Sequence, residues 1–130
     1  LGKERRKRAP GKEGKLGVSG VLFDVALDLR EGSPTFGKYH TELLKAEDQK
    51  VIFIPEGFAH GFIALSGNTI FSYQCSGEYV PNACGGIRWD DPDLNIPWPL
   101  KEYGVDKVIA TEKDKNWPNF EEYKVMHGIR

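Results

Sequence analysis

The alternation of apolar and polar positions along the chain predicts a protein built from short strands. In residues 21–29 (VLFDVALDL) every odd position from Val21 to Leu29 is apolar, whereas Asp24 and Asp28 occupy even positions. A period of two is typical of a strand with one face on a core and the other in solvent. We therefore predict a half-buried strand over residues 21–29.

Two further segments are predicted to be extended. Residues 50–54 (KVIFI) are mostly β-branched and apolar, and the turn residues Pro55 and Gly57 follow them. This composition favours a short buried strand. Residues 38–44, which follow the turn sequence EGSP at residues 31–34, are a weaker candidate.

The dipeptide Gly67-Asn68 separates two more candidate strands, residues 58–65 and 69–76. Such a dipeptide is typical of the two-residue turn of a hairpin. We therefore expect these two segments to pair directly.

A tight turn at that dipeptide sets the register of the predicted hairpin. It places Phe62 opposite Tyr73, and His60 opposite Cys75, so His60, Phe62 and Tyr73 share one face. A slip of one residue would separate them.

After Tyr79 the pattern becomes irregular. Residues 81–100 contain several prolines together with Trp89 and Trp98, which is typical of a stiff, anchored loop, and a short helix is expected near residues 119–125. Many short strands with Gly and Pro turns and almost no helix predict an all-β antiparallel sandwich or barrel.

Length and composition predict one soluble domain. The chain has 130 residues, of which 39% are hydrophobic, and no apolar run reaches the roughly 18 to 20 residues of a membrane span. No apolar segment of a secretory signal follows the basic N-terminal residues. Cys75 and Cys84 lack CxxC spacing, so we expect a reduced, cytoplasmic setting.

Charge is concentrated at the N-terminal end. Residues 1–15 hold seven Lys or Arg and two Glu, a balance of +5 that leaves −6 for the rest of a chain whose net charge is −1. A basic segment can bind nucleic acid, but this one has no aromatic residue to stack on a base, so we favour a disordered basic tail over residues 1–14 and one domain over residues 15–130. Because the chain begins with Leu, we also expect its natural start to be missing or altered.

The histidines do not form a metal-binding motif. His40, His60 and His127 lie far apart, without an HxH or HExxH pair, which disfavours a zinc or iron enzyme. Two interpretations of His60 remain open. It is either a core histidine held by a backbone hydrogen bond, or it acts with Tyr73 to bind or protonate an oxyanion.

Five motifs in order carry a resemblance to a known family. They are FDVALDLREGSPTFGKYHTELL, IPEGFAHGFIALS, the pair Tyr73 and Tyr79, GIRWDDPDLNIPWP, and TEKDKNWP. Over about residues 14–118 the sequence resembles the dTDP-4-dehydrorhamnose 3,5-epimerase family.

The resemblance implies a cupin-type jelly-roll barrel of antiparallel strands, a homodimer, and a reaction without metal or redox cofactor. Family members invert C3 and C5 of dTDP-4-keto-6-deoxyglucose on the route to dTDP-L-rhamnose. A base removes a proton next to the ketone, hydrogen-bond donors hold the enolate, and an acid returns a proton to the other face.

The resemblance also implies roles for individual residues. By it, Tyr73 is the proton donor, Tyr79 stacks on thymine, His60 contacts the sugar near the oxyanion, Lys15 and Lys113 bind substrate, and Asp114 orients the base histidine.

The N-terminal region departs from the family pattern. The family's base histidine lies in an RGLHxQ motif about ten residues before the GKL lysine, where this chain reads LGKERRKRAPGKEGKL without a histidine. The segment between Lys15 and Phe23 is also about two residues short, and Cys84 stands in place of a usual glutamate. Because His60 shares a face with Tyr73, we expect it to exchange protons without inversion. The sequence therefore leaves open an epimerase or a non-catalytic dTDP-sugar-binding protein.

Overall fold

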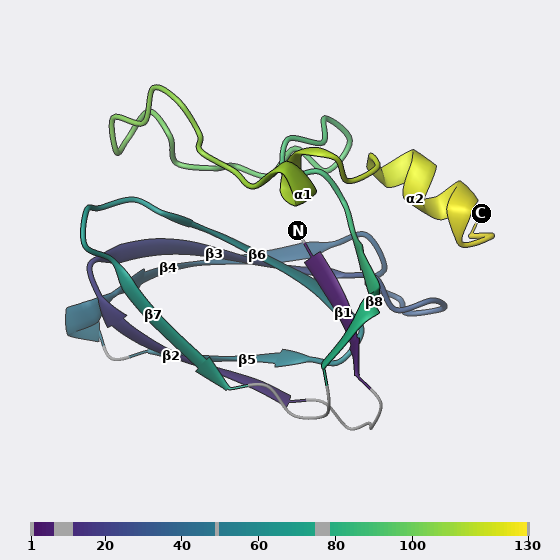
Figure 1. The fold of residues 1–130 in the computed structure, drawn as a ribbon, viewed down its shortest axis with the longest axis horizontal. Coiled ribbons are helices and arrows are strands. Elements are labelled where there is room, and N and C mark those ends of the chain that lie inside the picture. The colour runs from purple at the N-terminus through teal and green to yellow at the C-terminus, as the bar shows by residue number, and fades with distance from the viewer. Residues whose placement is uncertain (1, 7–11, 49, 75–78, 130) are drawn as a thin grey trace.

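Two antiparallel sheets face each other, and a C-terminal segment with two short helices lies outside them (Figure 1). The structure, a computed structural model, describes residues 2–6, 12–48, 50–74 and 79–129. The five-stranded sheet has the order β4 (Tyr39–Lys45), β3 (Val21–Asp28), β6 (Phe58–Ala64), β1 (Gly2–Arg6), β8 (Tyr79–Gly86). The three-stranded sheet has the order β5 (Val51–Pro55), β2 (Lys12–Ser19), β7 (Ile70–Gln74). The remaining elements are η1 (Ala46–Asp48), α1 (Glu112–Lys115) and α2 (Phe120–Met126). The expectation of a mainly antiparallel β protein with a short C-terminal helix is confirmed.

Strand β3 is buried on both faces, so the expectation of a half-buried strand is wrong. The odd positions, including Val25 and Leu27, belong to a core that also contains Ile87 and Tyr123 of the C-terminal segment. On the even positions, Asp24 and Asp28 keep only 2% and 1% of their surface exposed. The alternation identified the two faces correctly, but both are covered.

The C-terminal segment is fastened to the five-stranded sheet by packing and by one buried carboxylate. The Trp98 ring packs edge-on against Phe23 of β3. Asp91 accepts hydrogen bonds from the backbone N–H of Leu94 at 3.0 Å and of Phe120 at 2.6 Å. The second bond satisfies an N–H of the first turn of α2, a helix that a capping box at Asn119 also starts. The predicted helix near residues 119–125 is therefore confirmed.

The predicted hairpin around Gly67-Asn68 does not form. Strand β6 pairs with β3 and β1, whereas β7 pairs with β2 in the other sheet. His60 has Ala26 and Gly2 as its register partners, and Cys75 lies outside the described residues. The prediction of a direct pairing between these two strands was wrong.

Contacts of the turn with the start of β3 explain this difference. The Ser66 hydroxyl accepts a hydrogen bond from the backbone N–H of Val21 at 2.9 Å and also contacts Thr69. Gly20 has a φ of +82°, and a Cβ there would lie 2.5 Å from the Ser66 hydroxyl. Residues 65–69 are thereby held against the start of β3 and carry the chain into the other sheet.

The structure also differs from the predicted disordered tail over residues 1–14. Gly2–Arg6 form β1, between β6 and β8, and β2 begins at Lys12. Leu1 and residues 7–11 lie outside the described residues. Backbone pairing therefore extends into the segment that charge alone assigned to a tail.

In the described part of the chain, the structure contains no helix with the length and apolar character that crossing a membrane requires.

Candidate functional site

A row of four rings joins the facing sides of the two sheets. His60 and Phe62 come from β6, and Phe71 and Tyr73 come from β7. The ring centroids of Phe62 and Phe71 lie 4.8 Å apart, those of His60 and Phe62 5.7 Å, and those of Phe71 and Tyr73 5.8 Å. Phe71 also stacks on His60 at 6.4 Å. The expectation that His60, Phe62 and Tyr73 share one face of a sheet is wrong, because Tyr73 lies in the other sheet and Phe71 links it to the other two rings.

The sequence FAHGF explains why His60 faces the other sheet. Because side chains alternate along a strand, Ala59 and Gly61 lie on the opposite face of β6, where they pair with Leu27 and Val25. Ala59 is fully buried in the core there. The small residues fit against that core, and the two rings point toward β7.

Asp24 holds the His60 ring in place. Oδ2 of Asp24 lies 2.7 Å from Nε2 of His60, and the side chains are 2% and 14% exposed. An ionised carboxylate only accepts hydrogen bonds, so Nε2 donates, and the short distance is typical of a charge-assisted bond. The interpretation of His60 as a core residue held by a backbone hydrogen bond is therefore wrong, since its partner is a side-chain carboxylate.

Asp24 is the site residue that the sequence reasoning missed. The alternation in residues 21–29 predicts a solvent-facing Asp24, whereas the side chain faces the interior beside β6. One signal was present, since an acidic residue within an otherwise apolar strand requires a hydrogen-bonding partner when it is buried.

Tyr73 and Lys15 are neighbours in the backbone register. Tyr73 has 53% of its surface exposed, and its Cα partner on β2 is Lys15. Tyr79 is the first residue of β8 and pairs with Arg6 of β1. The side chains of Lys15 and Tyr79 lie outside the described part of the structure.

Asp114 and Lys113 belong to α1, in the C-terminal segment outside the two sheets (Figure 1). Asp114 accepts hydrogen bonds from the Thr111 hydroxyl at 2.9 Å and from Nε1 of Trp117 at 3.2 Å. Nζ of Lys113 lies 5.6 Å from the centre of the Trp117 ring. These contacts remain within residues 111–117, so the structure does not group Asp114 and Lys113 with His60 and Tyr73.

Among the described residues, no group of three or more His, Cys, Asp or Glu side chains is arranged to hold a metal ion.

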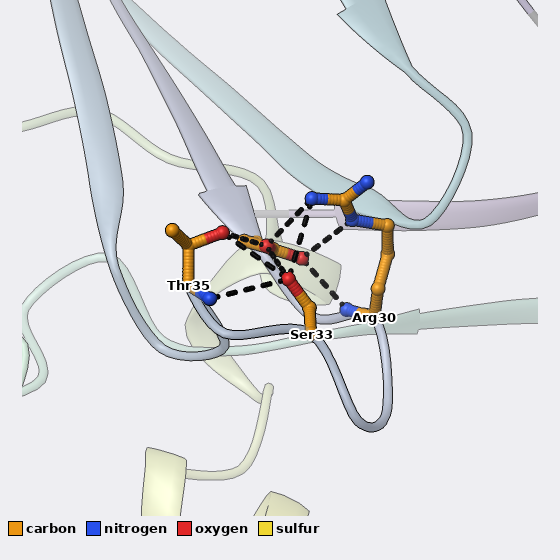
Figure 2. Close-up of polar contacts among 4 residues, drawn as sticks. Arg30, Ser33 and Thr35 are labelled. Atoms are coloured by element: carbon orange, nitrogen blue, oxygen red, sulfur yellow. Dashed lines mark hydrogen bonds and ion pairs between the residues drawn. The ribbon is translucent and has the colours of Figure 1, made fainter.

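A second buried carboxylate, Asp28, organises the turn after β3 (Figure 2). It accepts hydrogen bonds from Nε and Nη2 of Arg30, each at 3.0 Å, from the Ser33 hydroxyl at 2.7 Å, and from the Thr35 hydroxyl. Burial by itself would raise the pKa of Asp28, but the bonds from Arg30, Thr35 and Ser33 outweigh it and hold this pKa well below its ordinary value. Asp28 therefore stabilises the turn, and Arg30 packs over the Phe58 ring at 4.8 Å.

Fold and site together define an antiparallel β protein in which an imidazole–carboxylate pair of one sheet is linked through the Phe71 ring to a tyrosine of the facing sheet. Residues 7–122 match the family model described as dTDP-4-dehydrorhamnose 3,5-epimerase. The chain belongs to this family.

Individual relatives agree with the family match. The chain is 46% identical over 121 residues to the dTDP-4-dehydrorhamnose 3,5-epimerase of Methanothermobacter thermautotrophicus, covering 93% of this chain and 64% of that protein. The crystal structure of the Elizabethkingia anophelis enzyme is 39% identical, with a TM-score of 0.82 over 94% of this chain and 65% of that one. The Legionella pneumophila enzyme, solved in complex with dTDP-4-keto-L-rhamnose, is 32% identical, with a TM-score of 0.80 over 93% of this chain and 66% of that one. The chain thus spans about two thirds of the length of these relatives.

Proposed function

We propose that this chain binds a dTDP-4-keto-6-deoxy sugar and epimerises it at C3 and C5, in the route to dTDP-L-rhamnose. One observation carries the proposal: the buried Asp24–His60 pair lies on the side of β6 that faces Tyr73, with aromatic rings between them. The Legionella relative, whose structure contains dTDP-4-keto-L-rhamnose, supports the substrate class.

The proposed chemistry assigns one task to each group. His60, oriented by Asp24 through Nε2, donates a hydrogen bond from Nδ1 to the ketone oxygen as negative charge develops there, which requires both ring nitrogens to carry a proton. A base on the opposite side of the sugar, a task that none of His60, Tyr73 and Lys15 takes, removes the proton next to the ketone, and Tyr73 returns a proton to the same carbon as the general acid. Lys15, its register partner on β2, supplies a positive charge that stabilises the same enolate. None of these tasks requires a metal ion or a redox cofactor.

The remaining assignments follow the family resemblance. We propose that Tyr79 stacks on the thymine ring, that Lys113 contacts the substrate, and that Asp114 orients a base. We also propose a cupin-type jelly-roll barrel, a homodimer and a cytoplasmic location. The family match over residues 7–122 supports these proposals.

A second candidate function is binding of the sugar nucleotide without epimerisation. It is favoured by the sequence, in which no histidine precedes His40, so the segment before Lys15 offers no imidazole base. Loss of a general base typically lowers a rate by about 10²- to 10⁴-fold.

Incubation in deuterated buffer with dTDP-4-keto-6-deoxyglucose separates the two functions. Epimerisation predicts deuterium at C3 and C5 together with a product of rhamnose configuration, detected by NMR and mass spectrometry. Binding alone predicts a measurable dissociation constant for dTDP by calorimetry and no deuterium in the sugar. Failure to bind dTDP at millimolar concentration would rule out both.

A further inference from the structure

The site contains an apolar surface that the proposed acid–base chemistry does not use. Phe62 from β6 and Phe71 from β7 lie with their ring centroids 4.8 Å apart and meet between the two facing sheets. Phe62 contacts His60 on one side, and Phe71 contacts Tyr73 on the other. The two phenyl rings therefore connect the two polar ends of the site.

Phe62 remains substantially uncovered within this arrangement. Its exposed fraction is 48%, although it lies on the side of β6 that faces the other sheet. Apolar surface of this kind favours an apolar ligand group, because its burial removes water from both surfaces. A phenyl ring offers no hydrogen bond, so a hydroxyl group placed against it would lose its water without replacement.

The neighbouring polar groups do not relieve this restriction. Nε2 of His60 is hydrogen-bonded to Asp24 at 2.7 Å. In the proposed reaction the other ring nitrogen, Nδ1, binds the ketone oxygen. Phe71 contacts both His60 and Tyr73, and Phe62 contacts His60, so a sugar that contacts these two polar residues lies against the phenyl rings. These rings therefore favour an apolar part of the sugar, such as a methyl group.

We infer that Phe62 and Phe71 are specificity-determining residues that hold the C6 methyl group of the sugar and disfavour a C6 hydroxyl group. This inference rests on the proposed function, since it takes the ketone oxygen to lie at His60. In a 4-keto-6-deoxy hexose the methyl carbon is two bonds from the carbonyl carbon. The hydroxyl oxygen on C3 is equally two bonds away, on the other side of the carbonyl. Of these two groups, the methyl group is the one that the apolar Phe62 ring beside His60 favours.

A binding comparison with two sugar nucleotides tests the inference. The dissociation constants of dTDP-6-deoxyglucose and dTDP-glucose, which differ by the hydroxyl group at C6, are measured by calorimetry. The unmodified chain is expected to prefer the deoxy compound by about 10- to 100-fold, the range that one such group allows in an apolar pocket. Equal affinity for the two compounds would overturn the inference and leave the proposed function intact.

Substitutions of Phe62 then test whether this residue causes the preference for the 6-deoxy compound. Phe62→Gln, which offers hydrogen bonds to a hydroxyl group, is expected to reduce the preference to less than about threefold, whereas Phe62→Leu keeps an apolar surface and is expected to retain most of it. Phe53→Gln is the matched control, because Phe53 is similarly exposed, at 53%, but lies on the other face of its sheet. Ile52 pairs with Lys15, and Lys15 pairs with Tyr73, so these three residues share the face of the site. Phe53, the next residue after Ile52, lies on the opposite face. Phe53→Gln should therefore leave the preference unchanged.

Circular dichroism shows whether each variant is folded. The dissociation constant of dTDP alone shows whether it still binds the nucleotide. A Phe62→Gln variant that binds dTDP normally and keeps the full preference would contradict the inference. If the unmodified chain binds none of the three compounds, the proposed function itself fails.

Discussion

Asp24 and His60 lie 36 residues apart in the chain, yet Oδ2 of the first is 2.7 Å from Nε2 of the second. Both side chains are largely buried, and neither can turn toward solvent without losing its partner. The imidazole is therefore held in one orientation before any ligand arrives. Such preorganisation is what stabilises charge in a transition state.

Replacing Asp24 with Asn or Ala tests this arrangement. Asp24→Asn keeps a hydrogen-bond acceptor but removes the charge, whereas Asp24→Ala removes both. We expect Asp24→Ala to lower the rate of deuterium incorporation by about 10²-fold, as for loss of an oriented oxyanion donor, with a smaller effect for Asn. Nitrogen-15 NMR of the imidazole should report a mixture of ring orientations in Asp24→Ala. A rate unaffected by both variants would show that the pair is structural.

Tyr73→Phe removes a hydroxyl group and keeps the ring contact with Phe71 at 5.8 Å. If Tyr73 returns the proton, product formation should fall by about 10²- to 10⁴-fold, while the dissociation constant for dTDP should change little. The matched control is Tyr39→Phe, which removes a hydroxyl group that donates to the Asn95 carbonyl at 3.3 Å. Equal losses of activity in the two variants would argue against a specific role for Tyr73.

The lowered pKa of Asp28 predicts how stability depends on pH. Unfolding returns Asp28 toward its ordinary value of 3.8, so the unfolded chain binds a proton more readily than the folded chain. The stabilisation is complete above about pH 5 and is lost as the pH falls below the ordinary value toward the lower folded value. Denaturant unfolding at a series of pH values should show this decrease.

Asp28→Asn should weaken both the turn and its pH dependence. The charge of Asp28 strengthens its bonds to Arg30, Ser33 and Thr35, so its loss should lower the free energy of unfolding at neutral pH, and the difference from the unmodified chain should shrink below pH 4. Glu31→Gln, in the same turn but outside the network of Figure 2, is the control and should unfold like the unmodified chain. A constant difference between pH 7 and pH 2 would contradict the assignment of the pKa shift.

Asp91 links the loop after β8 to α2 through its bond to the N–H of Phe120. Asp91→Ala would leave buried backbone donors without an acceptor, at about 1 to 3 kcal/mol of unfolding free energy. Hydrogen exchange followed by mass spectrometry should show faster exchange in residues 112–129, whereas Asp93→Ala, at an exposed position, should not. Unchanged exchange in Asp91→Ala would mean that packing alone holds the C-terminal segment.

The sequence predicted where strand β3 lies better than it predicted which parts of the chain cover its two faces. Alternation located β3 and identified its two faces, because the period of two depends on the backbone alone. What covers each face depends on residues far along the chain. The C-terminal segment packs on the core that contains Val25, and Asp24 is buried beside His60 of the neighbouring strand, which no local pattern could reveal.

The grouping of His60 and Tyr73 was predicted for the wrong physical reason. The turn chemistry of Gly67-Asn68 suggested one sheet, but Ser66 bonds to the start of β3 and the chain crosses to the other. A hydrogen bond between residues 45 positions apart cannot be predicted from the local sequence pattern. The roles of Lys15, Tyr79, Lys113 and Asp114 stay predictions that came from the resemblance alone.

His60 and Tyr73 stand on separate sheets, so no ladder of backbone hydrogen bonds sets the distance between them. Paired strands keep a nearly fixed spacing of about 4.8 Å, whereas the separation of facing sheets, near 10 Å, depends on the volume of the side chains between them. Larger or smaller residues on these inner faces can therefore widen or narrow the space for a ligand without disturbing a single strand pairing. This architecture lets the same pair of polar groups be adjusted to sugars of different bulk through side-chain volume alone.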